Sequence, residues 1–211
     1  MLNYNKISAN DLKDELMKAQ DILKLKFDIQ KDSKDLDTNF IYYCGSFSSV
    51  LVLSIENGLS IEETNYAIRR WFNYHTSKMA EKLFVDNGAT PEENLKNKST
   101  DLYIDGIPFD IKLTVVPALY KETDLSKRTN KDDLIRWLYE NQSKEGRNGL
   151  QNRIFIVCKS SSYAKSILTK AEFDLIDLAI SKFINYYSDK EKNKIEIDGN
   201  TVYSDIILVS N

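Results

Sequence analysis

The chain has 211 residues, of which 42% are hydrophobic and 29% are charged, a composition typical of a folded globular protein. Its formal net charge is −3, which does not favour a nucleic-acid partner, although a local basic surface would be enough to bind one. No apolar run reaches the roughly 18–20 residues that a transmembrane helix needs. The first residues also lack the basic start and apolar core of a signal peptide. We therefore expect a cytoplasmic protein.

The cysteines and the histidine exclude several kinds of site. Cys44 and Cys158 are the only cysteines, and they lack the C-x-x-C spacing of a zinc or redox motif. We expect both to be buried and reduced. The single histidine, His75, argues against most zinc enzymes and against a Ser-His-Asp triad. A structural role for His75 is the stronger interpretation.

The first part of the chain is predicted to be helical. Residues 8–27 carry apolar residues at helical spacing, with Ser8 as N-cap, and a polar break follows at residues 31–37. Residues 39–56 fit a helix or a strand, and we favour a helix that ends at Gly58. Residues 1–58 are therefore predicted to form a helical N-terminal extension.

Residues 59–211 are predicted to form an α/β domain. Ser60 and Glu63 form a capping-box pattern, and Asn87-Gly88 suits a helix C-terminus, so a long helix is expected between them. The later predicted elements are a polar connector at 89–98, a hairpin at 101–114, helices at 131–145 and 163–187, a buried strand at 153–159 and a hairpin at 194–209. This order indicates a central mixed β-sheet flanked by helices.

The hairpin at residues 101–114, DLYIDGIPFDIKLT, combines a strong structural pattern with an unfavourable charge pattern. Asp105-Gly106 favours a type I′ turn, which would pair Leu102 with Phe109 and Asp101 with Asp110. Side chains alternate across a strand. One face would then carry Leu102, Ile104, Ile107, Phe109, Ile111 and Leu113, and the solvent-facing side would carry Asp101, Tyr103, Pro108, Asp110, Lys112 and Thr114. The apolar face fixes this register.

Two carboxylates and one ammonium group are thus expected within about 5–7 Å of one another. Like charges repel, but a divalent cation between Asp101 and Asp110 would relieve the repulsion. Mg²⁺ prefers such oxygen ligands together with water and phosphate oxygens. It also makes a bound water a better nucleophile, and Lys112 could orient that water or stabilise charge on the phosphate.

These residues resemble the PD-(D/E)xK nuclease superfamily, which has an acidic residue on one strand and Asp/Glu-x-Lys on its neighbour. Asp101 and Asp110-Ile111-Lys112 match that pattern, and Glu81 matches the glutamate that the family tends to place on the preceding helix. The resemblance implies a restriction-endonuclease-like core over residues 62–159. It also implies Mg²⁺-dependent cleavage of DNA, or less often RNA, with Mn²⁺ as a substitute metal. Glu81, Asp101 and Asp110 would be metal ligands, and all four residues catalytic. Thr100 replaces the proline of the motif.

Other interpretations stay open. The three charged hairpin residues could form a solvated face with a weak salt bridge, and the chain could be an inactive nuclease-fold protein that binds nucleic acid or protein. Hydrolysis of another phosphate ester is a third possibility. A basic segment downstream includes Lys127, Arg128 and Lys131, which could contact phosphates. Asp198 is expected in a turn and Asp205 beside Lys194, and a homodimer would suit cleavage of two strands.

Overall fold

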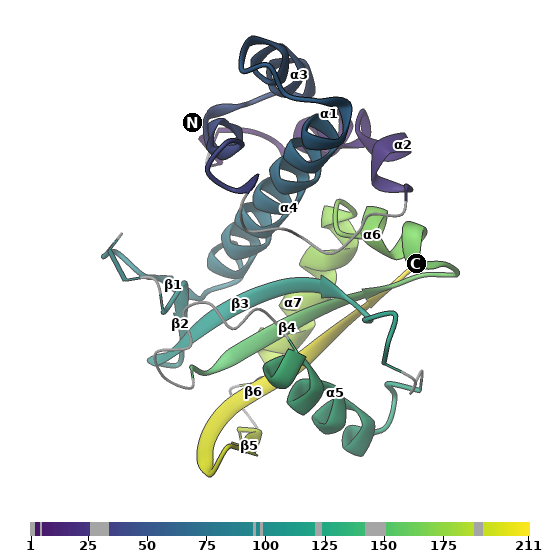
Figure 1. The fold of residues 1–211 in the computed structure, drawn as a ribbon. Helices are drawn as coiled ribbons and strands as arrows, with labels where there is room; N and C mark the ends of the chain where they lie inside the picture. Colours follow the sequence, from purple (N-terminus) through teal and green to yellow (C-terminus); the bar gives the residue numbers. More distant parts are fainter. Residues whose placement is uncertain are drawn as a thin grey trace.

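The computed structural model describes residues 3–4, 6–25, 34–94, 96–97, 99–120, 124–141, 151–187 and 192–211. The chain folds around one mixed sheet of six strands in the order β1-β2-β3-β4-β6-β5 (Figure 1). The strands are β1 (Thr90–Pro91), β2 (Leu102–Ile104), β3 (Ile107–Val115), β4 (Arg153–Lys159), β5 (Lys194–Ile197) and β6 (Asn200–Ser210). The α/β class with a mixed, helix-flanked sheet is as the sequence predicts.

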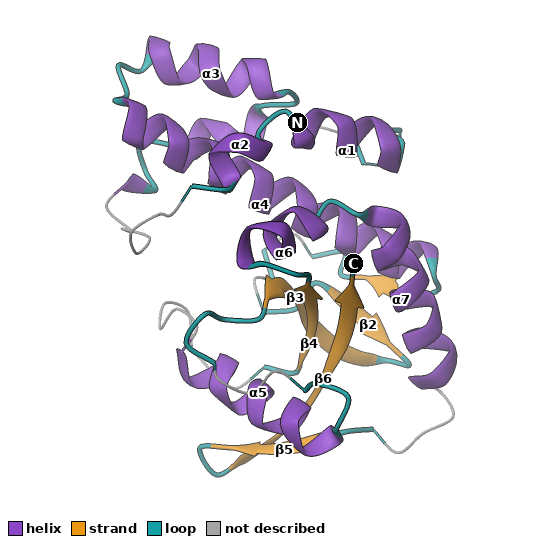
Figure 2. Ribbon diagram, turned by 90° about the vertical axis from the view of Figure 1, so that its right-hand side faces the viewer, coloured by secondary structure: helices purple, strands orange, loops and turns teal. Residues whose placement is uncertain are grey.

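The helices cover both faces of this sheet. They are α1 (Ala9–Met17), α2 (Gln20–Leu23), the 3₁₀-helix η2 (Asn39–Tyr43), α3 (Phe47–Glu56), α4 (Ile61–Asp86), α5 (Arg128–Asn141), α6 (Tyr163–Thr169) and α7 (Phe173–Tyr187). Ile111, Ile154 and Ile207 belong to the core on the α4 and α7 side, while Phe155 and Ile206 pack on the α5 side. Figure 2 shows α5 and α7 on opposite sides of the sheet. Among the described residues, none of the helices has the length and apolar character needed to cross a membrane.

The long helix α4 forms as its sequence predicts. The Ser60 hydroxyl accepts a hydrogen bond from the Glu63 N–H, and the Glu63 carboxylate accepts one from the Ser60 N–H at 2.8 Å. This reciprocal pair satisfies two N–H groups that the first helical turn would otherwise leave open. The helix ends at Asp86, and Gly88 follows with φ +106°. Helix α4 runs from the N-terminal helices to the strands β2 and β3 (Figure 1).

Three predicted helices are each divided in the structure. The one expected from residue 39 to Gly58 consists of the 3₁₀-helix η2 and the α-helix α3, separated by residues 44–46. The helix expected over residues 8–27 is capped by Ser8 but ends at Met17, and α2 starts at Gln20; residues 26 and 27 lie outside the described residues. The helix expected over 163–187 is interrupted between Thr169 and Phe173. Ala19 and Ala171, which lie at the breaks in the first and last of these helices, are fully buried. Burial of these positions against the core outweighs the continuous helical pattern.

Both hairpins turn where Asp-Gly predicts. Asp105 and Gly106 have φ values of +51° and +76°, and Asp198 and Gly199 have +49° and +75°, as a type I′ turn requires. The first hairpin pairs Leu102 with Phe109 and Ile104 with Ile107, so its predicted register is confirmed. The segment expected to be only a polar connector contains the short strand β1, which pairs with β2.

The remaining strands continue the sheet in parallel. Strand β3 pairs with β4, and β4 pairs with β6, both in parallel register, with helices between them along the chain. Helix α5 starts at Arg128, three residues before the predicted start, and the predicted residues 142–145 lie outside the described residues. Strand β4 has the predicted bounds, and both cysteines are free and buried.

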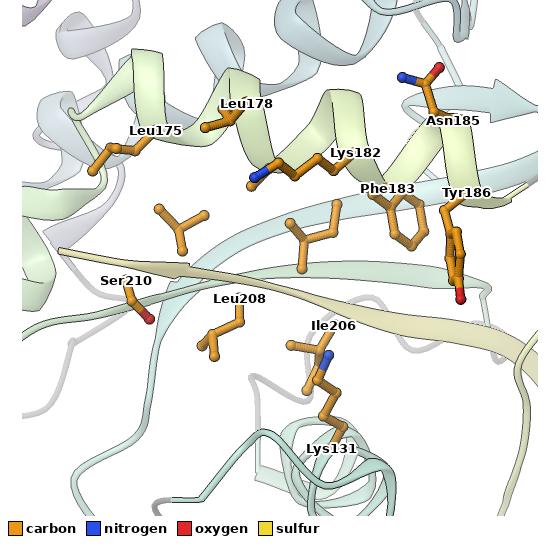
Figure 3. A pocket seen from close by; sticks show the side chains of 13 residues that line it. Lys131, Leu175, Leu178, Lys182, Phe183, Asn185, Tyr186, Ile206, Leu208 and Ser210 are labelled. Carbon is orange, nitrogen blue, oxygen red and sulfur yellow. The ribbon is translucent and has the colours of Figure 1, made fainter.

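A groove of about 800 Å³ lies between α7 and β6. Figure 3 shows Leu175, Leu178 and Phe183 of α7 above Ile206 and Leu208 of β6. The first four residues of β6 pair with β5, whereas the rest of the strand pairs with β4 alone among the described strands. Of the site residues proposed from the sequence, Lys131 lines this groove and Glu81, Asp101, Asp110 and Lys112 do not.

Candidate active site

Strand β3 places Asp110 and Lys112 on one face, because successive strand residues alternate between faces. Lys112 Nζ donates a hydrogen bond to Asp110 Oδ1 at 2.5 Å. The residue between them, Ile111, points into the core on the other face. The expectation that Asp110 faces solvent is wrong, because only 5% of this residue is exposed.

Arg153 at the start of β4 explains the burial of Asp110. The two residues are register partners in the parallel pair β3–β4, and Arg153 Nε donates to Asp110 Oδ2 at 2.9 Å. The Arg153 guanidinium also lies 4.9 Å from the ring centre of Tyr139 on α5. Both oxygens of Asp110 are therefore bound to cationic side chains, which offsets the cost of burying the carboxylate.

Asp101 terminates the pairing between β2 and β3. Its Oδ2 accepts a hydrogen bond from the Ile111 N–H at 2.8 Å, and its own N–H donates to the Phe109 carbonyl at 2.8 Å. The carboxylate thus takes the place of a backbone acceptor that an extension of β2 before Leu102 would have supplied. This contact satisfies the Ile111 N–H, which would otherwise have no partner beyond the end of the β2–β3 pairing. It therefore explains why a stable hairpin has an acidic residue beside Asp110.

Glu81 reaches the same centre from α4. Lys78, one helical turn earlier, donates to both Glu81 oxygens at 2.6 and 2.9 Å. Electrostatic interactions connect Glu81 with Asp101 and with Lys112. The structure therefore brings together the four residues that the sequence motif proposes as catalytic. Their placement makes one charged cluster at the junction of α4, β2 and β3.

The protonation equilibria of this cluster are perturbed by burial and by neighbouring charges. Burial raises the pKa of Glu81, and Asp101 raises it further against the opposing effect of Lys78 and Lys112. Burial likewise raises the pKa of Asp101, and Asp110 adds to the increase while the Ile111 N–H opposes it. For Lys78, burial lowers the pKa, but Glu81 and Asp101 outweigh it and the pKa is raised. Carboxylates held above their usual pKa are common at functional sites.

The donor set suits a hard divalent cation, since Glu81, Asp101 and Asp110 offer carboxylate oxygens of the kind that Mg²⁺ prefers. In the arrangement observed, however, Lys78, Lys112 and Arg153 neutralise these carboxylates. Within the described part of the chain, no three His, Cys, Asp or Glu side chains are grouped closely enough to hold a metal ion. A cation at Asp110 would require Lys112 to leave its present contact with Oδ1.

The sequence motif includes neither Lys78 nor Arg153, although both contact its carboxylates. The spacing of Lys78 places it beside Glu81, because residues three apart on a helix lie on the same surface. Arg153 gave no local signal, since it lies 43 residues from Asp110. Its position depends on the parallel pairing of β3 with β4, which no short motif reveals.

The basic segment lies on α5 and the loop before it. Lys127 forms an ion pair with Asp124, and Arg128 forms pairs with Asp132 and with Asp205 at 3.0 and 2.9 Å. The expected pairing of Asp205 with Lys194 is therefore wrong, because Arg128 occupies that carboxylate. Binding of nucleic acid by Lys127, Arg128 and Lys131 stays a prediction.

Comparison with known proteins gives this chain no relative: no family model, no curated protein and no solved structure matches it.

Proposed function

We propose that this protein is a metal-dependent nuclease of the PD-(D/E)xK type that hydrolyses phosphodiester bonds in DNA. The observation that carries the proposal is the convergence of Glu81, Asp101, Asp110 and Lys112 on one cluster from three separate elements. A solvated hairpin face would not need Asp101 to bind a backbone N–H or Asp110 to be buried. The pattern of perturbed carboxylates also favours a functional role.

The order of elements supports the proposal at the level of the fold. Helix α4, the antiparallel strands β1 to β3, helix α5 and the parallel strand β4 follow one another over residues 61–159. This is the helix, strands, helix, strand order that the resemblance implies for a restriction-endonuclease-like core. Fold order alone does not fix activity, so the charged cluster remains the stronger argument.

Each residue of the cluster has a distinct role in this proposal. Glu81, Asp101 and Asp110 would hold Mg²⁺, which when bound supplies Lewis-acid stabilisation and lowers the pKa of water. Lys112, once released from Asp110, would donate a hydrogen bond from its Nζ to the attacking water or to a phosphate oxygen. Arg153 keeps the Asp110 carboxylate oriented through the 2.9 Å contact with Oδ2.

A second candidate function has its own support. Lys112 and Arg153 already occupy both oxygens of Asp110, which suits a nuclease-fold protein that has lost its metal and serves as a binding module. This candidate predicts that Mg²⁺ does not bind. Isothermal titration of the protein with Mg²⁺ distinguishes the two functions, since the nuclease binds the ion and loses it when Asp101 is replaced by alanine.

A cleavage assay tests the proposed activity. Wild-type protein, Asp110→Ala and Lys112→Ala are incubated with plasmid and with linear single- and double-stranded DNA in Mg²⁺ or Mn²⁺. We expect cleavage by the wild type and a loss of at least about 100-fold in each variant, the size typical of a removed proton-transfer or charge-stabilising group.

Asp21→Ala is the matched control, because Asp21 is a strongly exposed aspartate on α2; it should cleave like the wild type. Circular dichroism of each variant confirms that it has folded. Cleavage at equal rates by all proteins, or by none, argues against the nuclease.

A further inference from the structure

A cavity of about 830 Å³ lies beside the charged cluster, and Lys112 is one of its wall residues. Its other walls come from the N-terminal segment, from α4 and from the first residue of α6. They are Asp35, Ile41, Tyr42, Tyr66, Arg69, Arg70, Asn73, Tyr74, Ser77 and Tyr163. We call this space the tyrosine–arginine cavity. Its volume lies within the range of about 300–1,000 Å³ that is usual for small-molecule sites.

The cationic side chains of this cavity are held in place by the fold. Arg70 donates to the Thr38 hydroxyl at 2.6 Å and to the Tyr42 hydroxyl at 2.9 Å. Asp35 is the one carboxylate among the described wall residues; it contacts Arg70 at 3.5 Å and accepts a hydrogen bond from Tyr66. Arg69, Arg70 and Lys112 thus give the wall an excess of positive charge.

A buried lysine adds to this charge from behind the wall. Lys170 is only 8% exposed, and its Nζ donates to Asn73 Oδ1 at 2.6 Å. Burial lowers the pKa of Lys170 to about 8; nearby Cys158 opposes the decrease and Arg69 adds to it. An anion in the cavity would relieve the crowding of these cations, as phosphate groups do beside arginine and lysine.

Four tyrosines contribute aromatic rings to the wall. Tyr42 and Tyr74 pack edge to face with ring centres 4.9 Å apart, and the Arg70 guanidinium lies 5.5 Å from the centre of the Tyr42 ring. Tyr163 is 53% exposed. Nucleic-acid sites that bind unpaired strands combine such rings with cations, because every base has a face that stacks on an aromatic ring.

The cavity and the charged cluster share one face of α4. Tyr66, Arg70, Asn73 and Ser77 recur every three or four residues, which places them along one side of the helix, and Glu81 continues the same row. The row from residue 66 to residue 81 extends about 22 Å at 1.5 Å per residue. Lys112 belongs to both the cavity and the cluster, so a strand along this row would lead directly to the proposed metal ligands.

We infer that the tyrosine–arginine cavity binds an unpaired segment of a nucleic-acid strand, with phosphates at Arg69, Arg70 and Lys112 and a base against the tyrosines. This inference rests on the proposed function, because it makes the cavity the substrate channel of the nuclease. Duplex fits the same walls less well, since its bases are stacked on each other and present no free face to the rings. The substrate class is therefore single-stranded DNA or RNA, or the unpaired part of a branched molecule.

Fluorescence anisotropy without divalent metal tests the inference apart from catalysis. Labelled single-stranded DNA, the same sequence as RNA, and the DNA duplex are titrated in EDTA with wild-type protein, Tyr163→Ala and Arg69→Gln. We expect the wild type to prefer single strands, and each variant to bind them about 5- to 100-fold more weakly, as for a lost stacking or phosphate contact. Comparison of the RNA and single-stranded DNA titrations shows which sugar the cavity accepts.

Two exposed residues outside the cavity supply matched controls. Tyr186 is 58% exposed on α7 and Arg136 lies on α5, so Tyr186→Ala and Arg136→Gln should bind like the wild type. Equal binding by the cavity variants and these controls, or tighter binding of duplex, would overturn the inference. If Mg²⁺-dependent cleavage persists in that case, the protein is a nuclease whose substrate does not bind in this cavity. If single-strand binding depends on the cavity but nothing is cleaved, the cavity is a nucleic-acid site and the proposed nuclease activity is wrong.

Discussion

The carboxylate of Asp101 both stabilises and destabilises the folded protein. It accepts a hydrogen bond from the Ile111 N–H just before β2 begins, yet burial and the charge of Asp110 raise its pKa above the usual value for aspartate. A carboxylate with a raised pKa in the folded state costs stability wherever it is ionised in both states. Sites that keep such groups commonly do so for function, which trades stability for activity.

Replacement of Asp101 by asparagine should therefore stabilise the protein at neutral pH. The amide oxygen keeps an acceptor for the Ile111 N–H while removing the charge, and we expect a gain of about 0.5–2 kcal/mol at pH 7. The gain should shrink as pH falls through the raised pKa and vanish below the ordinary aspartate pKa of 3.8, where the wild-type carboxyl is protonated in both states. Urea unfolding followed by circular dichroism at pH 7 and pH 4 measures the difference.

Asp21→Asn is the control for this experiment, because that side chain is 88% exposed and its replacement should change the stability little at either pH. A lower stability of Asp101→Asn at pH 7 would mean that the Ile111 contact needs a full negative charge. The variant should also lose cleavage if Asp101 is a metal ligand.

At the level of elements, the two hairpins provide a comparison within one chain. Each turns through Asp-Gly, with the glycine at φ +76° in one and +75° in the other. A Cβ added at Gly106 or at Gly199 would meet no atom within 4 Å. The loss of stability on replacement by alanine at either position therefore comes from the left-handed backbone conformation alone.

Gly106→Ala and Gly199→Ala should accordingly destabilise the protein by similar amounts, about 1–2 kcal/mol each. Thermal and urea unfolding of the two variants measure this. Gly58→Ala, with φ +66° and the same open surroundings, extends the comparison to a position after a helix. A much larger loss at Gly106 alone would indicate that the first hairpin also supports the charged cluster, since Asp101 directly precedes β2 and Asp110 lies within β3.

Local signals account for the elements that sequence reasoning found. Alternation and Asp105-Gly106 define the first hairpin, and the Ser60–Glu63 pattern defines the start of α4; both depend on residues close in sequence. The breaks in the helices at Ala19 and Ala171 contain no glycine or proline, so they depend on packing. The burial of Asp110 depends on Arg153, which parallel pairing brings from a distant part of the chain.

At the scale of the whole molecule, the N-terminal helices share a core with α4 and the sheet. Leu12 and Leu16 of α1 and Leu23 of α2 are buried in the same hydrophobic cluster as Trp71 of α4 and Ile111 of β3. The predicted boundary near residue 58 separates segments that bury apolar surface together. The tyrosine–arginine cavity also takes walls from both sides of this boundary, so its shape depends on the packing of the N-terminal segment.

Truncation of a buried leucine in α1 should therefore weaken the entire fold. Leu16 is 0% exposed, and Leu16→Ala should cost about 2–5 kcal/mol through lost burial and the cavity that remains. Leu36→Ala is the control, because Leu36 is 81% exposed. We expect one cooperative urea transition for each protein, with near-ultraviolet dichroism and tryptophan fluorescence changing together. An early separate transition in Leu16→Ala, with the sheet still folded, would instead assign residues 1–58 to an independent unit, because only weakly coupled segments unfold apart.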